Sequence, residues 1–204
     1  VVFFSYYKSK MANELAIKAR SKNICIDLYT TSPNRYTTFN SVALEFEKKD
    51  NLQIHRILVP SPKNGILGQI LSFKKFYFEV KRLTKNKKVD LVFASSSKFF
   101  TAFLGYNIAR KSKSQLYLDI RDIFIDTLDS IIKLKILKLL LLPFLKTIEN
   151  KTFNYASHIN LISPGFKSYF QNYKNSTFSF YTNGVDEIFL SKSDTSKMES
   201  KPNK

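Results

Sequence analysis

Several residue types are scarce in this chain of 204 residues, and each scarcity excludes a class of site. The single cysteine, Cys25, allows no internal disulfide, so a reducing compartment is the default, and we expect Cys25 to be a small core residue. His55 and His158 lie too far apart in sequence, and have too few accompanying ligands, to indicate a metal site. Only five glycines occur, and none forms a phosphate loop, a dinucleotide-binding turn or a Gly-x-Ser-x-Gly elbow. Disulfide scaffolds, metal centres, dinucleotide sites and serine triads are therefore disfavoured.

Long uncharged apolar runs are also missing. In the Leu/Lys-rich segment, the longest uncharged run is residues 139–145, far below the roughly 20 residues that a membrane helix needs. The chain opens on Val-Val-Phe-Phe with no basic segment before it, so we expect no cleavable signal peptide, and the missing Met hints at a trimmed start. We expect a cytoplasmic protein, or one peripheral on the inner face of the cytoplasmic membrane.

What the chain does have is apolar content and positive charge. Hydrophobic residues make up 44% and aromatic residues 15%, which predicts a folded domain with its own core. Lysine and arginine number 33 against 16 acidic residues, a net charge of +17. This charge favours an anionic partner such as phosphate groups, acidic lipid or nucleic acid, although most of the basic side chains are expected simply to face solvent.

Short apolar runs alternate with segments of helical period, which predicts an α/β fold with a Rossmann-like, doubly wound parallel sheet of about seven strands. The predicted strands are residues 1–5, 24–30, 52–59, 89–94, 115–120, 158–162 and 177–181. The predicted helices between them are residues 10–21, 66–84 and 97–111, whose apolar stripes, including Ile17 and Ile70, are expected to be core.

The Leu/Lys-rich segment, residues 131–152, has two readings. We expect Pro143 to divide it into two shorter helices. In helical projection Lys135, Lys138 and Lys146 share one arc, which suits contact with an anionic membrane. A helix packed on the sheet with its lysines outward produces the same pattern, so both readings stay open.

The predicted strands end in unusually polar residues. Because the carboxyl ends of such strands face a common crevice, these residues are the candidate site. The candidates are Ser95, Ser96, Arg121, Asp122, Asn183 and Gly184. An Arg fork binds phosphate oxygens and carboxylates accept sugar hydroxyls, so the set suits a polyhydroxylated, phosphate-bearing ligand.

Simpler roles are open for some of these residues. Ser95 and Ser163 could only cap the helices that follow them. Asp119, Arg121 and Asp122 could form a plain salt-bridged turn.

Four sequence runs, in order, resemble the amino-terminal domain of a family 4 glycosyltransferase of the GT-B type. They are Val-Asp-Leu-Val-Phe-Ala-Ser-Ser from Val89, Leu-Tyr-Leu-Asp-Ile-Arg-Asp-Ile-Phe from Leu116, the run from Glu149 through Ala156-Ser-His-Ile-Asn-Leu-Ile-Ser, and Asn183-Gly-Val-Asp. The resemblance covers about half of the chain. Ser5 to Lys10 replace the family's usual glycine-rich loop, which puts donor contacts from this half in doubt. Ser157 replaces the family's usual Asp, a change expected to affect only packing or capping.

The resemblance implies a retaining enzyme that moves a sugar from a nucleotide-sugar to an acceptor without a metal. It implies that residues 1–190 are a Rossmann-like acceptor-binding domain and that the nucleotide-sugar domain is absent, so that this half binds no cofactor. The Ser, Lys, Asp and Asn content of residues 191–204 predicts a flexible linker or tail. Arg121 and Asp122 would border the acceptor, Asn183 and Gly184 would form the cleft floor at a hinge, and Glu149 would hold the local fold.

The function that we expect is transfer to a saccharide acceptor, lipid-linked in the leading hypothesis, in the assembly of bacterial surface polysaccharides such as O-antigen or capsule. We expect residues 1–204 alone to transfer no sugar. Two alternatives remain: an inactive, truncated remnant of such an enzyme, or a basic module that binds polyanions or nucleic acid. The second is disfavoured because the aromatic residues follow core spacing, so no nucleic-acid partner is expected.

Overall fold

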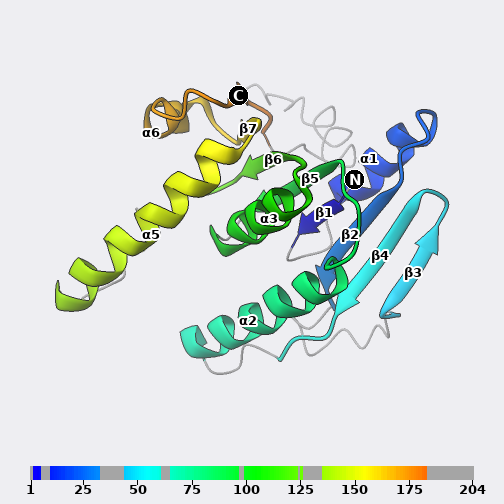
Figure 1. The fold of residues 1–204 in the computed structure, drawn as a ribbon, viewed down its shortest axis with the longest axis horizontal. Helices are drawn as coiled ribbons and strands as arrows, with labels where there is room; N and C mark the ends of the chain where they lie inside the picture. The colour runs from blue at the N-terminus through cyan, green and yellow to red at the C-terminus, as the bar shows by residue number, and fades with distance from the viewer. Residues whose placement is uncertain are drawn as a thin grey trace, which may run out of the picture.

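The computed structural model describes residues 2–5, 10–32, 44–60, 65–96, 99–123, 125 and 135–182. They form one eight-stranded sheet with helices on both faces (Figure 1). The strands are β1 (Val2–Ser5), β2 (Ile26–Thr31), β3 (Phe46–Lys49), β4 (Leu52–Ile57), β5 (Leu91–Ser96), β6 (Gln115–Ile120), β7 (His158–Leu161) and β8 (Thr177–Ser179). The helices are α1 (Lys10–Arg20), α2 (Gly65–Leu83), α3 (Phe99–Ser112), α5 (Lys135–Tyr155), α6 (Lys167–Phe170) and the 3-10 helix η1 (Pro164–Phe166).

The strand order, β3-β4-β2-β1-β5-β6-β7-β8, confirms a doubly wound α/β sheet. The chain starts near the middle with β1, builds outward through β2 and β4, and then crosses to β5 and builds in the other direction. Every strand pair is parallel except that of β3 with β4. The reversal between β1 and β5 is where open α/β sheets bind ligands, outside the carboxyl ends of the strands.

The additional strand, β3, is one that the sequence pattern does not indicate. Phe46–Lys49 contains one aromatic and three charged residues and stays largely exposed at the sheet edge. A tight turn at Asp50, whose φ is 52°, leads directly into β4. The strand therefore forms through its turn and its pairing with β4 rather than through burial. Charges on such an edge also hinder pairing with other chains.

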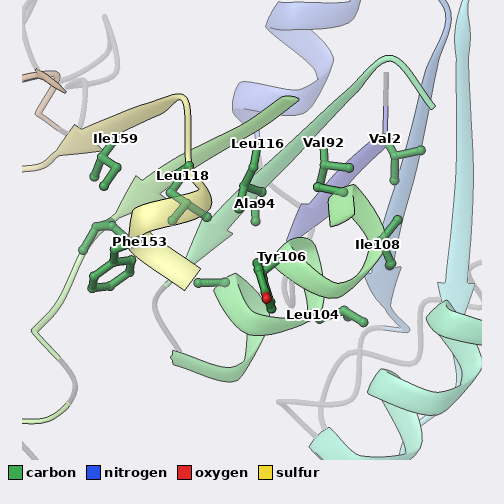
Figure 2. Packing of buried hydrophobic residues seen from close by; sticks show 14 of the residues in the cluster. Val2, Val92, Ala94, Leu104, Tyr106, Ile108, Leu116, Leu118, Phe153 and Ile159 are labelled. Carbon is green, nitrogen blue, oxygen red and sulfur yellow. The ribbon is translucent and has the colours of Figure 1, made fainter. Parts of the chain in front are cut away.

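The main core lies between the sheet and the helices α2, α3 and α5. Figure 2 shows Leu104 and Ile108 of α3 among apolar side chains of β5 and β6, including Val92 and Leu116. Burying such side chains stabilises the fold by about 1.5–3 kcal/mol each. On the opposite face α1 packs through small residues against β2 and β4. The strands are thus apolar on both faces, which explains why their runs stand out in the sequence.

Helix α5 runs unbroken from Lys135 to Tyr155, so the prediction that Pro143 divides it is wrong. Proline lacks the N–H that would bond the carbonyl of Leu139, and its ring crowds that carbonyl. Both residues are exposed, so water can hydrate that carbonyl. Buried Leu145 and Phe153 hold the rest of the helix against the protein.

Three side chains expected in the core are exposed. Ile17 is 66% exposed because α1 packs on the sheet through Ala12 and Ala16, on another side of the helix. Ile70 on α2 is 57% exposed. Cys25 is exposed just before β2 begins. The predicted flexible tail, residues 191–204, lies outside the described residues.

Candidate functional site

A row of polar side chains crosses neighbouring strands near the carboxyl edge of the sheet. Strand register pairs Ser95 with Asp119, Asp119 with Asn160, and Asn160 with Ser179. Register partners point to the same face of a sheet, so these four side chains form one line, called here the polar row. Ser95, Asp119 and Asn160 are buried, and polar groups at that depth need hydrogen-bond partners.

Asp119 is the central acceptor of the polar row. Its Oδ2 accepts hydrogen bonds from Ser95 Oγ and from Arg121 Nε, both at 2.9 Å. Its Oδ1 accepts from Asn160 Nδ2 at 2.8 Å. Only 5% of the Asp119 side chain is exposed, so protein donors take the place of water around the carboxylate. The carboxylate thereby orients the Arg121 guanidinium directly beyond the end of β6.

Asn160 connects Asp119 to β8 and to the residues that follow it. Its Nδ2 also donates to the Tyr181 carbonyl oxygen at 3.2 Å. Its Oδ1 accepts from Ser179 Oγ at 3.0 Å and from the Tyr181 backbone N–H at 2.8 Å. A single buried amide therefore fixes the backbone where the chain leaves β8, two residues before Asn183.

Aromatic rings stack one pleat earlier on the same face of the sheet. The ring centroids of Phe93 and Tyr117 are 4.7 Å apart, and those of Tyr117 and His158 are 4.4 Å apart. The His158 ring also bonds Ser179 Oγ at 2.8 Å and Thr177 Oγ1 at 2.7 Å. Burial lowers the pKa of His158 and raises the pKa of Tyr117, so both rings are neutral at pH 7. These contacts stiffen the strands that carry the polar row.

The residues predicted to border the sugar acceptor lie at the ends of β5 and β6. Ser95 is buried and donates to Asp119, so it supports the site from beneath. Ser96 is the last residue of β5, and its side chain lies outside the described set. Arg121 and Asp122 follow β6 directly; 33% of the Arg121 side chain is exposed, and Asp122 is exposed.

The simpler roles considered for these residues hold for some of them and not for others. Ser163 does cap a helix, because its Oγ accepts from the Gly165 N–H at the start of η1 at 3.2 Å. Ser95 is instead part of the polar row. Asp119 and Arg121 do form an ion pair, but Asp119 is buried and bonded to two other strands, so the pair is more than a surface turn. Asn183 and Gly184 lie outside the described residues.

Lys135, Lys138 and Lys146, for which the sequence leaves membrane contact open, all lie on α5. The side chains of Lys135 and Lys138 are outside the described set. Lys146 is held within the protein: its Nζ donates to buried Glu149 and lies 4.4 Å from the centroid of the Tyr169 ring.

Glu149 joins α5 to the segment around α6. It accepts hydrogen bonds from the Tyr169 hydroxyl at 2.9 and 2.8 Å and from the Tyr173 hydroxyl at 3.1 Å. Burial, followed by the nearby Glu149 carboxylate, raises the pKa of Tyr173, so this phenol stays protonated and donates. Fully bonded inside the protein, Glu149 acts here as a structural residue.

Sequence reasoning misses Asn160. The available signal is an amide at an inward position of an apolar strand, His158-Ile-Asn-Leu, where only a bonded partner makes burial tolerable. In the sequence, Asp119 belongs to a charged run that also carries the family resemblance, whereas the structure makes its carboxylate the shared hydrogen-bond acceptor of Ser95, Arg121 and Asn160.

The arrangement suits binding more than covalent chemistry. A guanidinium carries five N–H donors, and the one on Nε donates to Asp119, which holds the group at the end of β6. Among the residues described, no group of three or more His, Cys, Asp or Glu side chains could hold a metal ion. In the same ranges, no helix combines the length and apolarity needed to cross a bilayer.

No protein-family profile and no curated protein matches this chain. Solved structures do match it. One sucrose-phosphate synthase structure from Thermosynechococcus elongatus is 13% identical with a TM-score of 0.57, over 95% of this chain and 95% of that chain. Another from the same organism is 10% identical with a TM-score of 0.59, over 91% of this chain and 48% of that chain. Arabidopsis thaliana UGT89C1 complexed with quercetin is 8% identical with a TM-score of 0.51, over 94% of this chain and 53% of that chain.

The last two of these neighbours are about twice as long as the aligned region, so this chain spans about half of their length. At these identities the likeness concerns the fold. Together with the strand order, it shows that the chain has the fold of a GT-B Rossmann-like domain.

Proposed function

We propose that this chain is the acceptor-binding half of a glycosyltransferase, with the acceptor bound at the carboxyl ends of β5 and β6. The observation that carries the proposal is the buried Asp119 carboxylate, which orients Arg121 beyond the end of β6 in a fold of the GT-B type. Burying a carboxylate costs desolvation free energy, and only well-placed donors, here three of them, offset that cost.

The chemistry of the edge suits a sugar that carries a phosphate. Arg121 offers N–H donors to phosphate oxygens, and the exposed carboxylate of Asp122 can accept hydrogen bonds from sugar hydroxyls. Ser95 acts through Asp119, so it is a positioning residue. Ser96 at the end of β5 belongs to the proposed cleft, and Asn183 and Gly184 remain its predicted floor.

The remaining parts of the proposal concern the whole enzyme. A second domain holds a nucleotide-sugar, and transfer retains the anomeric configuration. The acceptor is a saccharide linked to lipid through a diphosphate, in the assembly of bacterial surface polysaccharide on the inner face of the cytoplasmic membrane. The resemblance of the four sequence runs and the net charge of +17 support these parts.

Binding of a short-chain prenyl-diphosphate monosaccharide, measured by isothermal titration calorimetry, tests the proposal. Arg121→Ala is expected to weaken binding about tenfold or more, because a hydrogen bond to a charged group contributes about 1.5–3 kcal/mol. Arg110→Ala is the matched control. Arg110 is an exposed arginine in the last turn of α3, on the side of the sheet where the strands have their amino ends. Equal affinities for wild type and Arg121→Ala would refute an acceptor site at Arg121.

A further inference from the structure

The outer side of α2 carries an unusual pattern of exposed residues. Seven of its side chains face solvent along one arc, called here the α2 outer face: Ile70, Leu71, Lys74, Lys75, Phe78, Lys81 and Arg82. In Figure 1, α2 is the lowest of the labelled helices and lies on the same face of the sheet as α3 and α5. Three large apolar side chains and four basic ones therefore share a single exposed strip.

The arrangement within the strip is regular. Leu71 and Phe78 are seven residues apart, so they lie on one line along the helix. Lys74 and Lys81 form a parallel line on one side of them. Lys75 and Arg82 form another on the other side. The outer face of α2 thus has an apolar centre between two basic borders.

Packing against the sheet does not account for the apolar centre. The opposite side of α2 already packs on the core through buried Phe76 and Val80 and half-buried Phe73 and Tyr77. Leu71 and Phe78 point away from that core and are 59% and 57% exposed. Apolar side chains gathered in this way, rather than scattered singly, indicate an interaction surface.

The charges of the strip are almost all positive. Glu79 is the only acidic residue of α2, and it pairs with Arg82 at 2.8 Å. Within the described ranges, neither Lys74 nor Lys75 has an ion-pair partner. As far as the described residues go, Lys74 and Lys75 therefore place unpaired positive charge directly beside exposed apolar groups.

From this pattern we infer that the α2 outer face binds the surface of an anionic membrane. Leu71 and Phe78 enter the boundary between headgroups and acyl chains, and the flanking lysines extend along the helix to lipid phosphates. This contact lies on α2 rather than on α5, where Lys146 is held by Glu149 and Tyr169, and it holds whether or not the protein transfers sugar.

Other partners fit the strip less well. Protein interfaces are depleted in lysine at their centre, whereas here lysines border the apolar line on both sides. Single-stranded nucleic acid is bound by successive aromatic platforms, whereas this strip offers one exposed aromatic ring, Phe78, beside aliphatic Ile70 and Leu71. An anionic bilayer can bind both the aliphatic side chains, through its acyl region, and the basic side chains, through its phosphates.

Flotation with phosphatidylcholine vesicles, with and without phosphatidylglycerol, tests the inference. Wild-type protein should float with the anionic vesicles at low salt and lose most of that binding at high salt. Phe78→Ser and the double variant Lys74→Glu/Lys75→Glu should each lower the vesicle partition coefficient about tenfold or more. Because these vesicles contain no saccharide acceptor, the outcome is independent of the proposed transferase function.

The matched controls lie on α1 and in the turn that follows it, and α1 packs on the opposite face of the sheet. Ile17→Ser removes an apolar side chain that is at least as exposed as Phe78, and Lys18→Glu/Lys22→Glu makes the same change in net charge as the double variant on α2. Both should bind vesicles as the wild type does, and thermal unfolding checks that every variant is folded. Wild-type binding by the α2 variants, equal loss in the α1 controls, or displacement from vesicles by oligonucleotide but not by anionic lipid would each overturn the inference.

Discussion

Replacing Asp119 with alanine is expected to lower the free energy of unfolding by about 2–4 kcal/mol. The change leaves the buried donors of Ser95 and Asn160 without their acceptor, at about 1–3 kcal/mol each. Part of this loss is offset because a buried charge disappears. Arg121 adds little, since a third of its side chain is exposed and water can replace the carboxylate. Urea denaturation followed by circular dichroism measures the effect.

The adjacent carboxylate supplies the control for this substitution. Asp122→Ala removes an exposed side chain and should change the free energy of unfolding by less than about 0.5 kcal/mol. The loss at Asp119 should also reach β8, because Asn160 would no longer be held on both sides. Faster hydrogen exchange of the Tyr181 amide in Asp119→Ala would report this loosening. Unfolding of Asp119→Ala at the wild-type urea concentration would contradict the central position given to its carboxylate.

A leucine at position 105 is expected to destabilise the fold by more than about 3 kcal/mol, beyond the usual cost of overpacking. Gly105 lies where α3 rests directly on the sheet. A Cβ atom there would be 2.9 Å from the Ala94 Cβ and 3.3 Å from the Leu116 Cδ1. Leucine adds further carbons to the same space, so α3 must lift away from the sheet and expose its core residues.

Alanine at the same position separates sterics from helix propensity. Gly105→Ala gains about 1 kcal/mol of helix propensity, yet its methyl group meets Ala94, so a net loss of about 1–2 kcal/mol is expected. Adding Ala94→Gly removes that contact and should recover part of the loss. A double-mutant cycle by thermal unfolding measures this coupling. Strictly additive effects, or a stable Gly105→Leu protein, would show that α3 is not packed this closely.

Much of the fold could be predicted because most of its strands are buried on both faces and are therefore apolar throughout. The two features that the sequence pattern does not predict, β3 and the unbroken α5, both lie where the chain is exposed to solvent. β3 is held by a turn and by pairing at an exposed edge, and its composition carries no strand signal. Pro143 is tolerated because it lies on the exposed side of α5. Local composition does not reveal either circumstance.

The site was only partly predictable for a different reason. Position at the end of a strand was enough to single out Arg121 and Asp122. The partnership of Asp119 with Asn160 joins residues 41 apart in the chain, and it depends on the register between β6 and β7. A register is a property of the assembled sheet, so no local pattern contains it.

The amphipathic pattern of α2 shows the same limit. The spacing of Ile70, Phe73 and Tyr77 is that of a core stripe, and two of these side chains do pack on the core. Ile70 is exposed because the buried arc of α2 centres on Phe76 and Val80. A helical period shows which residues share a side of the helix, but the neighbouring elements determine how wide the buried side is.

Photolabelling would locate the acceptor most directly. A diazirine-bearing prenyl-diphosphate saccharide is irradiated with the purified chain, and the labelled peptides are identified by mass spectrometry. We expect the label on peptides that contain Ser95 and Arg121, at the carboxyl ends of β5 and β6, and we expect unlabelled ligand to compete it away. Label confined to peptides that contain Lys87 and Lys113, which precede the amino ends of β5 and β6, would contradict an acceptor site beside Arg121.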